Sequence, residues 1–153
     1  MTVCICGYSV LIDDNLLFLV EDYNWSINSN EERRDGRIYF KNQKHIFLHR
    51  LIMGCTVNDG IVIDHINGNT LDCRKENLRK CSRAQNAHNC VKPKHNTSGY
   101  KGVSFYKNRN KWVAGIKVNN RRINLGYFIT PEDAYKAYCD ASEKYHGEFG
   151  RIK

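Results

Sequence analysis

The most constraining feature of this sequence is a change in hydrophobic period between residues 100–128 and residues 130–146. Apolar and polar residues alternate through the segments GVSFY, KWVAGIKV and RRINLGYF, which asparagine-rich turns separate. Alternation with a period of two is typical of strands that bury one face. From Thr130 onward, apolar residues recur at helical spacing until Gly147. The sequence therefore predicts a three-stranded antiparallel sheet packed on one helix.

The alternation also assigns the side chains of the sheet to two faces. Val103, Trp112 and Ile123 fall on the face that the helix would cover. The other face is left for Ser104, Tyr106, Lys117, Arg122 and Asn124. In this interpretation the free face carries few aromatic rings, which argues against an RNA-binding protein that stacks bases on its sheet.

Positive charge is concentrated in the last two thirds of the chain. Residues 1–60 hold 6 Lys/Arg and 8 Asp/Glu, a net charge of −2, and residues 61–97 hold 7 and 3, a net charge of +4. Residues 98–153 hold 11 and 5, a net charge of +6. A basic domain is the electrostatic footprint of a polyanion, although a solvated basic surface has the same composition. Charge alone leaves both interpretations open.

The N-terminal 60 residues predict a small β-rich region. YSVLI and LLFLV are short apolar runs, and RIYFKNQKHIFLHRLI has the pattern of a hairpin. The polar segment NSNEERRDG predicts a loop. Asp13 and Asp14 interrupt the apolar N-terminus, so we expect folded structure here and not a signal peptide. Because no run of about 18 apolar residues is present, no membrane span is expected.

The following segment predicts a short strand, a turn and a short helix. IVID is an apolar strand, and Asn67-Gly68 is a turn signal. Ser82, with Gln85 three residues later, has the spacing of a capping box at the start of a helix.

Residues 63–86 contain the groups that phosphodiester hydrolysis requires. The reaction needs a base that activates water and a cation that stabilises the developing negative charge. Asp64 and Asn86 offer a carboxylate and an amide oxygen, and Mg²⁺ accepts one or two protein oxygens. His65 is the natural base near neutral pH. Asn77 either orients the imidazole or braces the loop. An adjacent Asp-His pair is more often structural, so spacing alone does not decide its role.

The run LHRLIMG…VIDHINGNTLDCRKENLRKCSRAQN, at about residues 48–90, resembles the HNH endonucleases, specifically the phage and intron-encoded homing branch. The resemblance implies a ββα-metal fold with Asp64 and Asn86 as metal ligands. It also implies His65 as the base that activates water and Asn77 as the middle Asn of the HNH name. Because the final ligand is Asn, as in the homing branch, Mg²⁺ or Mn²⁺ is favoured over a softer metal.

Four further residues of this segment have less certain roles. Arg79 and Arg83 either clamp the scissile phosphate or are solvated charges. Cys73 stands where the family often has Asn, and we expect no catalytic consequence. His49 matches a His-Arg of the family, and we favour packing or a hydrogen bond that supports the hairpin.

The landmarks YKGV, KWVA, LGYF and HGEF give residues 98–150 a resemblance to the plant ethylene-response-factor (apetala-type) DNA-binding domain. In that family the sheet lies in the major groove and the helix backs it, which implies double-stranded DNA as the partner. The family's contact positions map onto Lys101, Ser104, Tyr106, Lys117, Arg122 and Asn124, and the loop residues Lys107 and Arg109 should reach phosphate. Several arginines and the contacting tryptophan of the plant pattern are replaced, so the plant target sequence is not expected.

These observations predict an α+β chain of two domains. Residues 1–92 form an HNH nuclease domain, with a small β-rich N-terminal region and a ββα-metal core at about 60–90. Residues 93–98 form a linker, because the segment KPKHNTSG marks a boundary. Residues 99–153 form the DNA-binding domain, a three-stranded antiparallel sheet packed on one helix.

The predicted function is a homing-type, metal-dependent, site-directed DNA endonuclease that hydrolyses phosphodiester bonds. One active site cuts one strand, so a monomer should nick, and the sequence is compatible with a monomer or a homodimer. The alternative is a catalytically inactive, sequence-specific DNA-binding regulator, against which the intact Asp64, His65 and Asn86 argue. The seven cysteines lack CxxC pairs, so we expect reduced thiols in a microbial or phage-encoded protein of the host cytoplasm.

Overall fold

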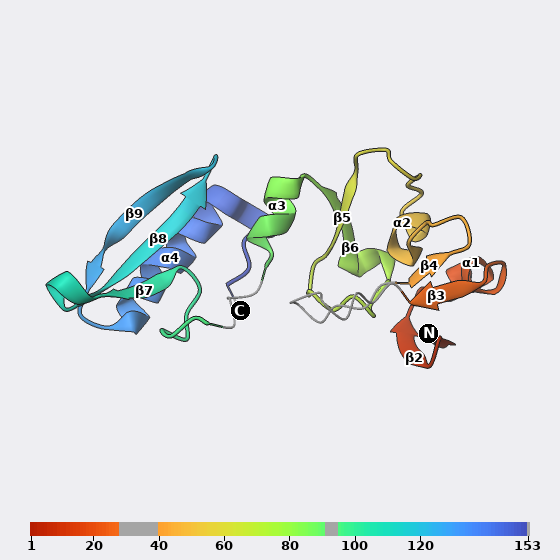
Figure 1. Ribbon diagram of the computed structural model, residues 1–153, viewed down its shortest axis with the longest axis horizontal. Helices are drawn as coiled ribbons and strands as arrows, with labels where there is room; N and C mark the ends of the chain where they lie inside the picture. Colours follow the sequence, from red (N-terminus) through yellow and green to blue (C-terminus); the bar gives the residue numbers. More distant parts are fainter. Residues whose placement is uncertain (28–39, 91–94, 153) are drawn as a thin grey trace. The chain divides into compact units, whose positions relative to one another are not determined.

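The computed structural model describes residues 1–27, 40–90 and 95–152, which fall into two units (Figure 1). The first unit comprises Met1–Asn86 and the second Ala87–Lys153. Both units mix short strands and helices, which confirms the predicted α+β class. No helix in these described ranges is long and apolar enough to cross a membrane. The expected loop NSNEERRDG and the start of the expected linker lie outside the described residues.

The first unit is built from short elements. In chain order they are β1 (Thr2–Ile5), β2 (Tyr8–Leu11), the 3-10 helix η1 (Asp14–Leu16), α1 (Leu17–Glu21), β3 (Trp25–Ile27), β4 (Phe40–Asn42), α2 (Leu48–Ile52), β5 (Val62–His65), η2 (Lys75–Asn77), β6 (Leu78–Cys81) and α3 (Arg83–His88). The strands form antiparallel pairs of β1 with β2, β3 with β4, and β5 with β6. The boundary between the two units falls inside α3.

Two segments of the N-terminal region differ from the prediction. The run LLFLV, expected among strands, forms the end of η1 and most of α1, and its residues Leu17, Leu19 and Val20 pack against the core. In the described part of the expected hairpin RIYFKNQKHIFLHRLI, an isolated bridge joins Lys41 to Phe47 before the chain enters α2. Short apolar runs suit either element, and packing against the rest of the chain decides between them.

The predicted strand IVID and the helix after it are both present. The observed strand β5 is shifted by one residue from IVID, because it omits Ile61 and includes His65, and its pairing with β6 places Asp64 opposite Arg79. Ser82 and Gln85 form the predicted capping box. The Ser82 backbone N–H donates to Gln85 Oε1 at 2.8 Å, and the Gln85 backbone N–H donates to Ser82 Oγ at 3.1 Å. These reciprocal bonds fix the start of α3.

An apolar core joins the N-terminal region to this hairpin. Its buried members are Ile5, Val10, Ile12, Leu16, Phe40, Leu48, Ile52, Cys55, Ile63, Cys73 and Leu78. Backbone hydrogen bonds make the same connection, because Leu11 N–H donates to Leu71 O and Cys73 N–H donates to Leu11 O, each at 2.8 Å. The end of β2 therefore supports the loop that follows β5.

The second unit contains the predicted sheet and helix. Its elements are β7 (Val103–Tyr106), η3 (Lys107–Arg109), β8 (Lys111–Val118), β9 (Arg121–Phe128), α4 (Pro131–His146) and η4 (Gly147–Phe149). The strands lie in the order β7-β8-β9, antiparallel throughout, and α4 covers one face of the sheet (Figure 1). Thr130 Oγ1 accepts a hydrogen bond from Asp133 N–H at 3.2 Å, which is the predicted cap.

Small residues bring α4 close to the sheet. Ala114 of β8 and Ala134 of α4 are both fully buried in this interface. Gly102 precedes β7 at a position where a Cβ atom would overlap the Tyr138 ring, so a larger residue does not fit. Trp112 packs on the same side of the sheet, as predicted.

A β-bulge divides β9 into two parts. Gly115 pairs with Asn124 but Ala114 pairs with Gly126, so Leu125 is an extra residue in β9. Gly126 has a φ of 129°, and its N–H donates to Asn124 Oδ1 at 2.9 Å. An extra residue shifts the phase of alternation along a strand. Residues of β9 before the bulge follow the predicted faces, whereas those after it are exchanged between the faces.

Candidate functional site

The fold holds His65 between two other side chains of the first unit. His65 ends β5, is 5 % exposed, and its Nε2 lies 4.0 Å from Cys73 Sγ. The ring of His49, on α2, meets the His65 ring edge-on at a centroid distance of 5.2 Å. The backbone carbonyl of His65 accepts a hydrogen bond from Gly68 N–H at 2.8 Å, which closes the predicted turn. These contacts restrict the orientation of the imidazole.

The two side chains beside His65 are uncharged at neutral pH. Burial, with smaller effects of His65 and Arg50, lowers the pKa of His49 to about 3. Burial also raises the pKa of the Cys73 thiol to about 12, with a smaller effect of Asp72. The His49 ring stacks on Phe47 at 5.6 Å, which gives it the packing role favoured from the sequence.

Asp64 is held by a charged partner on the neighbouring strand. Its Oδ2 accepts hydrogen bonds from Arg79 Nη2 at 2.8 Å and Nε at 3.0 Å. The two side chains are 4 % and 12 % exposed, so the pair is largely removed from water. This contact follows from the strand register, in which the two residues face each other. Arg79, predicted to clamp phosphate, thus lies at the predicted metal ligand.

Asn77 uses its amide group to brace the loop after β5. Its Oδ1 accepts a hydrogen bond from Asn67 N–H at 2.9 Å, and its Nδ2 donates to Asp72 O at 2.8 Å. The carboxylate of Asp72 in turn accepts from Asn67 Nδ2 and forms an ion pair with Arg74. Of the two roles left open by the sequence, these contacts correspond to bracing the loop.

Asn86, the second predicted metal ligand, lies on α3. Its backbone N–H donates to Ser82 O at 3.0 Å, so the first turn of the helix fixes its backbone five residues after the end of β6. Within the described ranges, no three His, Cys, Asp or Glu side chains form a group that could hold a metal ion. A metal here would depend on a carboxylate from Asp64 and an amide from Asn86. Hard oxygen donors of this kind fit Mg²⁺, which keeps its other positions for water and phosphate.

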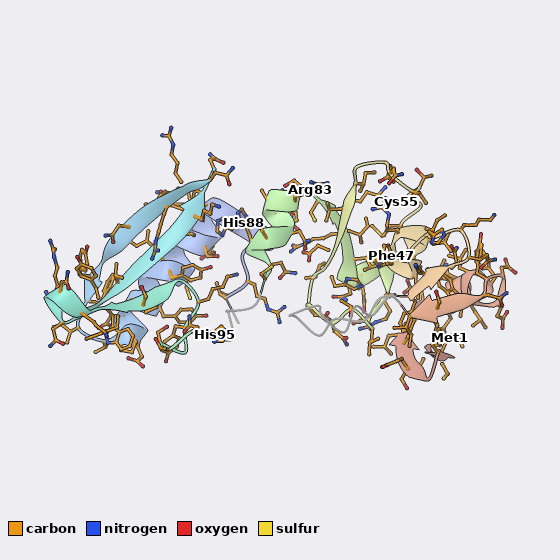
Figure 2. All side chains as sticks on the ribbon, in the orientation of Figure 1. Met1, Phe47, Cys55, Arg83, His88 and His95 are labelled. Carbon is orange, nitrogen blue, oxygen red and sulfur yellow. The ribbon has the colours of Figure 1, made fainter. Side chains whose placement is uncertain are left out.

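Arg83, the other predicted phosphate clamp, stands at the first turn of α3. It lines an open cavity of about 280 Å³ together with Phe47, Arg50 and Val62. Figure 2 labels Arg83 and Phe47. Two arginine side chains therefore border the cavity, and the charge of Arg50 is balanced by an ion pair with Asp59. This placement is compatible with an anionic ligand, and the phosphate role of Arg83 stays a prediction.

The free face of the sheet in the second unit carries the predicted polar set. Lys117 lies directly opposite Arg122 on the neighbouring strand, and Gly115 lies opposite Asn124. The Arg122 guanidinium covers Gly115, where an added Cβ would lie 3.0 Å from Arg122 Nε. Two like charges opposite each other destabilise a strand pair. An anionic ligand on this face would remove that repulsion.

The same face carries aromatic rings that the sequence interpretation underestimated. The rings of Tyr106 and Tyr127 are 5.7 Å apart, and the Arg109 guanidinium lies 4.7 Å from the centre of the Tyr127 ring. Simple alternation puts Tyr127 with Ile123 on the helix side. The bulge moves it to the free face, opposite Val113. The free face therefore carries Tyr127 in addition to the predicted Tyr106, and the Gly126 that makes the bulge is the signal that points to it.

The remaining predicted DNA contacts occupy different surroundings. Ser104 is exposed on β7, and Lys107 is exposed in η3. Lys101 is half-buried, and its Nζ donates to the backbone carbonyls of His88 at 2.6 Å and Arg151 at 3.3 Å. Burial lowers the pKa of the Lys101 ammonium group. Its described contacts lie within the unit, so a role toward DNA stays a prediction.

Comparison with known proteins relates both units to established families. A family model described as HNH endonuclease matches residues 43–88, and one described as AP2 domain matches residues 98–148. Protein 3.8 of Escherichia phage T7 is 32 % identical over 117 residues, which cover 76 % of this chain and 95 % of that protein.

A second relative is an uncharacterized HNH endonuclease of Acanthamoeba polyphaga mimivirus. It is 31 % identical over 109 residues, which cover 71 % of this chain and 56 % of that protein. The match thus spans little more than half the length of the mimivirus protein. No solved structure matches the chain.

Proposed function

We propose that this chain, which carries an HNH endonuclease domain followed by an AP2 domain, is a metal-dependent, site-directed DNA endonuclease. It would hydrolyse phosphodiester bonds in double-stranded DNA and cut one strand at each active site. The observation that carries this proposal is the end of β5, where a buried Asp64 is followed by a His65 whose ring is fixed on two sides. The AP2 domain would choose the site.

His65 is the proposed base. Its neighbours His49 and Cys73 are neutral at working pH, because burial lowers the first pKa to about 3 and raises the second to about 12. Neither neighbour therefore adds a charge that would oppose the transfer of a proton from water to the imidazole. The braced loop at Asn77 keeps the strand end and its turn in place. Fixed orientation is what a general base needs in order to act on one water molecule.

Asp64 and Asn86 are the proposed ligands of a divalent ion, Mg²⁺ or Mn²⁺. When bound, such an ion stabilises the negative charge that develops on the phosphate and the leaving oxygen. Arg79 balances the Asp64 carboxylate inside the hairpin, and Arg83 would bring a second cation toward the scissile phosphate. These residues would position the phosphate and balance its negative charge, while His65 would accept the proton of the attacking water.

The decisive experiment is a Mg²⁺-dependent cleavage assay on randomised duplex DNA with the wild-type chain and His65→Ala. Loss of a general base is expected to lower the cleavage rate by about 10²- to 10⁴-fold. His95→Ala is a matched control, because His95 is exposed and belongs to the second unit, outside the proposed site. EDTA should abolish cleavage and leave DNA binding intact.

A DNA-binding regulator without cleavage is the second candidate. The Asp64–Arg79 ion pair favours it, because this pair occupies an oxygen of the proposed metal ligand. Sequence-specific binding by the wild type without cleavage at any Mg²⁺ or Mn²⁺ concentration would select this function and overturn the nuclease. Recurrent nicks that disappear in His65→Ala would exclude it.

A further inference from the structure

The free face of the sheet in the second unit divides into two halves of different chemistry. We call Tyr106, Val113 and Tyr127 the aromatic half, and Lys117, Arg122 and Asn124 the basic half. The bulge of β9, which faces Ala114 and Gly115 of β8, separates the two halves. The basic half lies before the bulge along β9, and Tyr127 of the aromatic half lies after it. One sheet face therefore offers two kinds of contact to a single partner.

The aromatic half is exposed, although its members are apolar. Tyr106 is 39 % exposed and Tyr127 is 37 % exposed. The helix α4 packs on the opposite face, where Ala114 and Ile116 are buried, so these rings do not contribute to that core. Exposed aromatic rings that gather on one surface are typical of a binding site.

A specific backbone feature puts Tyr127 there. Without the extra residue in β9, alternation would turn this ring toward α4 and turn Phe128 to the surface. The Gly126 φ of 129° and the hydrogen bond from its N–H to Asn124 Oδ1 hold the bulge. Bulges commonly re-aim a side chain at a functional surface. The side chain that stabilises the bulge belongs to the basic half, so the two halves are built together.

Cations surround the aromatic half. The Arg109 guanidinium lies over the Tyr127 ring at 4.7 Å, and the exposed Lys111 pairs with Tyr106 across the strands. With Lys117 and Arg122 at the other end of the face, positive charge borders the rings on two sides. An apolar patch bordered by cations is complementary to a groove of duplex DNA that presents an apolar group between two rows of phosphates.

Only one base edge in duplex DNA has such an apolar group. Thymine carries a C5-methyl group, which lies in the major groove, about 12 Å wide, where a β-ribbon can enter. The minor groove is about 6 Å wide and presents no methyl group. We propose that Tyr106 and Tyr127 contact thymine methyl groups in the major groove, so that thymine is required opposite the aromatic half. This inference rests on the proposed binding of duplex DNA and is independent of cleavage.

The geometry favours methyl contact over base stacking on a single strand. Stacking needs an open ring face, and successive bases stack best on rings with parallel planes. The Tyr106 and Tyr127 planes are inclined by 48°, and Arg109 covers one face of Tyr127. Ring edges and the Val113 side chain are left to form a shallow apolar surface, which suits a methyl group.

The test is a binding selection with the full-length chain on randomised duplex DNA in EDTA, which prevents metal-dependent cleavage. Thymines of the selected sequence are then replaced one at a time by deoxyuridine, which removes only the methyl group. Wild type is expected to lose about fourfold in affinity for each methyl in contact, the effect of removing one buried carbon group. Tyr106→Ser and Tyr127→Ser should bind less tightly and should not distinguish thymine from uracil at the corresponding positions.

Two variants serve as controls for this selection. Tyr127→Phe keeps the ring and should retain the thymine preference. Tyr145→Ser removes a tyrosine of similar exposure, 43 %, that also lies beside a lysine but on α4, and it should behave as wild type.

Equal affinity of the wild type for thymine and uracil at every selected position would overturn the inference, as would tighter binding of the single strand than of the duplex. A thymine requirement in a chain that never cleaves would support the inference while removing the nuclease proposal.

Discussion

The two units present their charged groups in opposite ways. In the first unit, Asp64 is paired with Arg79 inside the hairpin, and His65 is enclosed by neighbouring rings. In the second unit, Lys117 and Arg122 face each other on an open sheet, and no ion pair within the described ranges holds either of them. The proposed catalytic groups are thus organised by folding alone, whereas the proposed binding face would reach its best electrostatic state only with an anion present.

The largest effect is expected from a substitution in the buried ion pair of the first unit. Asp64→Asn should lower the cleavage rate at least a hundredfold, because a metal ligand is lost. It should also destabilise the first unit by on the order of 3 kcal/mol, because Arg79 is left as a buried cation without its partner. A cleavage assay and denaturant unfolding in EDTA measure the two effects.

A double variant separates these two consequences of Asp64→Asn. The combination Asp64→Asn/Arg79→Met removes the stranded charge and should recover stability without recovering cleavage. Asp140→Asn, at an exposed aspartate of α4, is the control and should change neither quantity. Full cleavage by Asp64→Asn would remove Asp64 from the proposed site.

Acid should unfold the first unit through His49. Its pKa is about 3 in the folded chain and 6.5 in an ordinary environment, so folding disfavours its protonation. The stability that this group contributes is therefore complete above pH 6.5 and is lost as the pH falls toward 3, by about 1.4 kcal/mol for each pH unit. His49→Asn should flatten the dependence of unfolding free energy on pH in this window. His95→Asn should not, and an unchanged slope in His49→Asn would contradict a buried neutral His49.

The open face of the second unit should respond in the opposite sense to the buried pair. Lys117→Glu replaces a repulsive cross-strand pair by an attractive one with Arg122, and should raise the unfolding free energy by about 0.5 kcal/mol. The same change should weaken duplex binding by at least about tenfold. It should also reduce the slope of log affinity against log salt concentration by about the value of one phosphate contact.

Lys136→Glu makes the same charge change on the exposed surface of α4 and serves as the control for Lys117→Glu. Calorimetry and salt-dependent binding measure the two effects. Equal losses of affinity in the two variants would show that overall charge, and not this face, binds DNA.

The smallest effect on DNA binding is expected at the bulge. Gly126→Ala places a side chain at a φ of 129°, which costs about 1 kcal/mol of stability. The strain should favour loss of the bulge and a different orientation of Tyr127, so duplex affinity should fall a few-fold. Measurements of the unfolding free energy and of duplex affinity test this prediction. Gly150→Ala is not a suitable control, because an added Cβ atom there would also clash.

The contrast between the two units also explains how much of each can be predicted from the sequence. The second unit depends on local signals, namely alternation, asparagine turns and the Thr130 cap, and its strands and helix are found where those signals place them. The prediction for this unit fails at Tyr127, because only the pairing with β8 defines which face each side chain of the bulged strand takes. Side-chain counting along one strand cannot contain that information.

In the first unit, the motif identifies the candidate residues but not their contacts. The pairing of Asp64 with Arg79 requires the register of two strands whose intervening loop is long, and the edge-on contact of His49 with His65 requires the position of α2. The run LLFLV is equally compatible with a strand or a helix, and packing against the core selects α1. Long-range contacts of this kind leave no local signature in the sequence.

The backbone hydrogen bonds that join Leu11 to Leu71 and Cys73 determine how small a fragment of the first unit can still fold. The residues matched by the HNH family, 43–88, omit this strand and five of the eleven buried residues of the shared core. Excised alone, they would expose the backbone groups of the loop and the apolar side of Cys73 to water. The smallest autonomous folding unit is therefore larger than the recognisable motif, and transplanting the motif into another protein would require the N-terminal hairpin to travel with it.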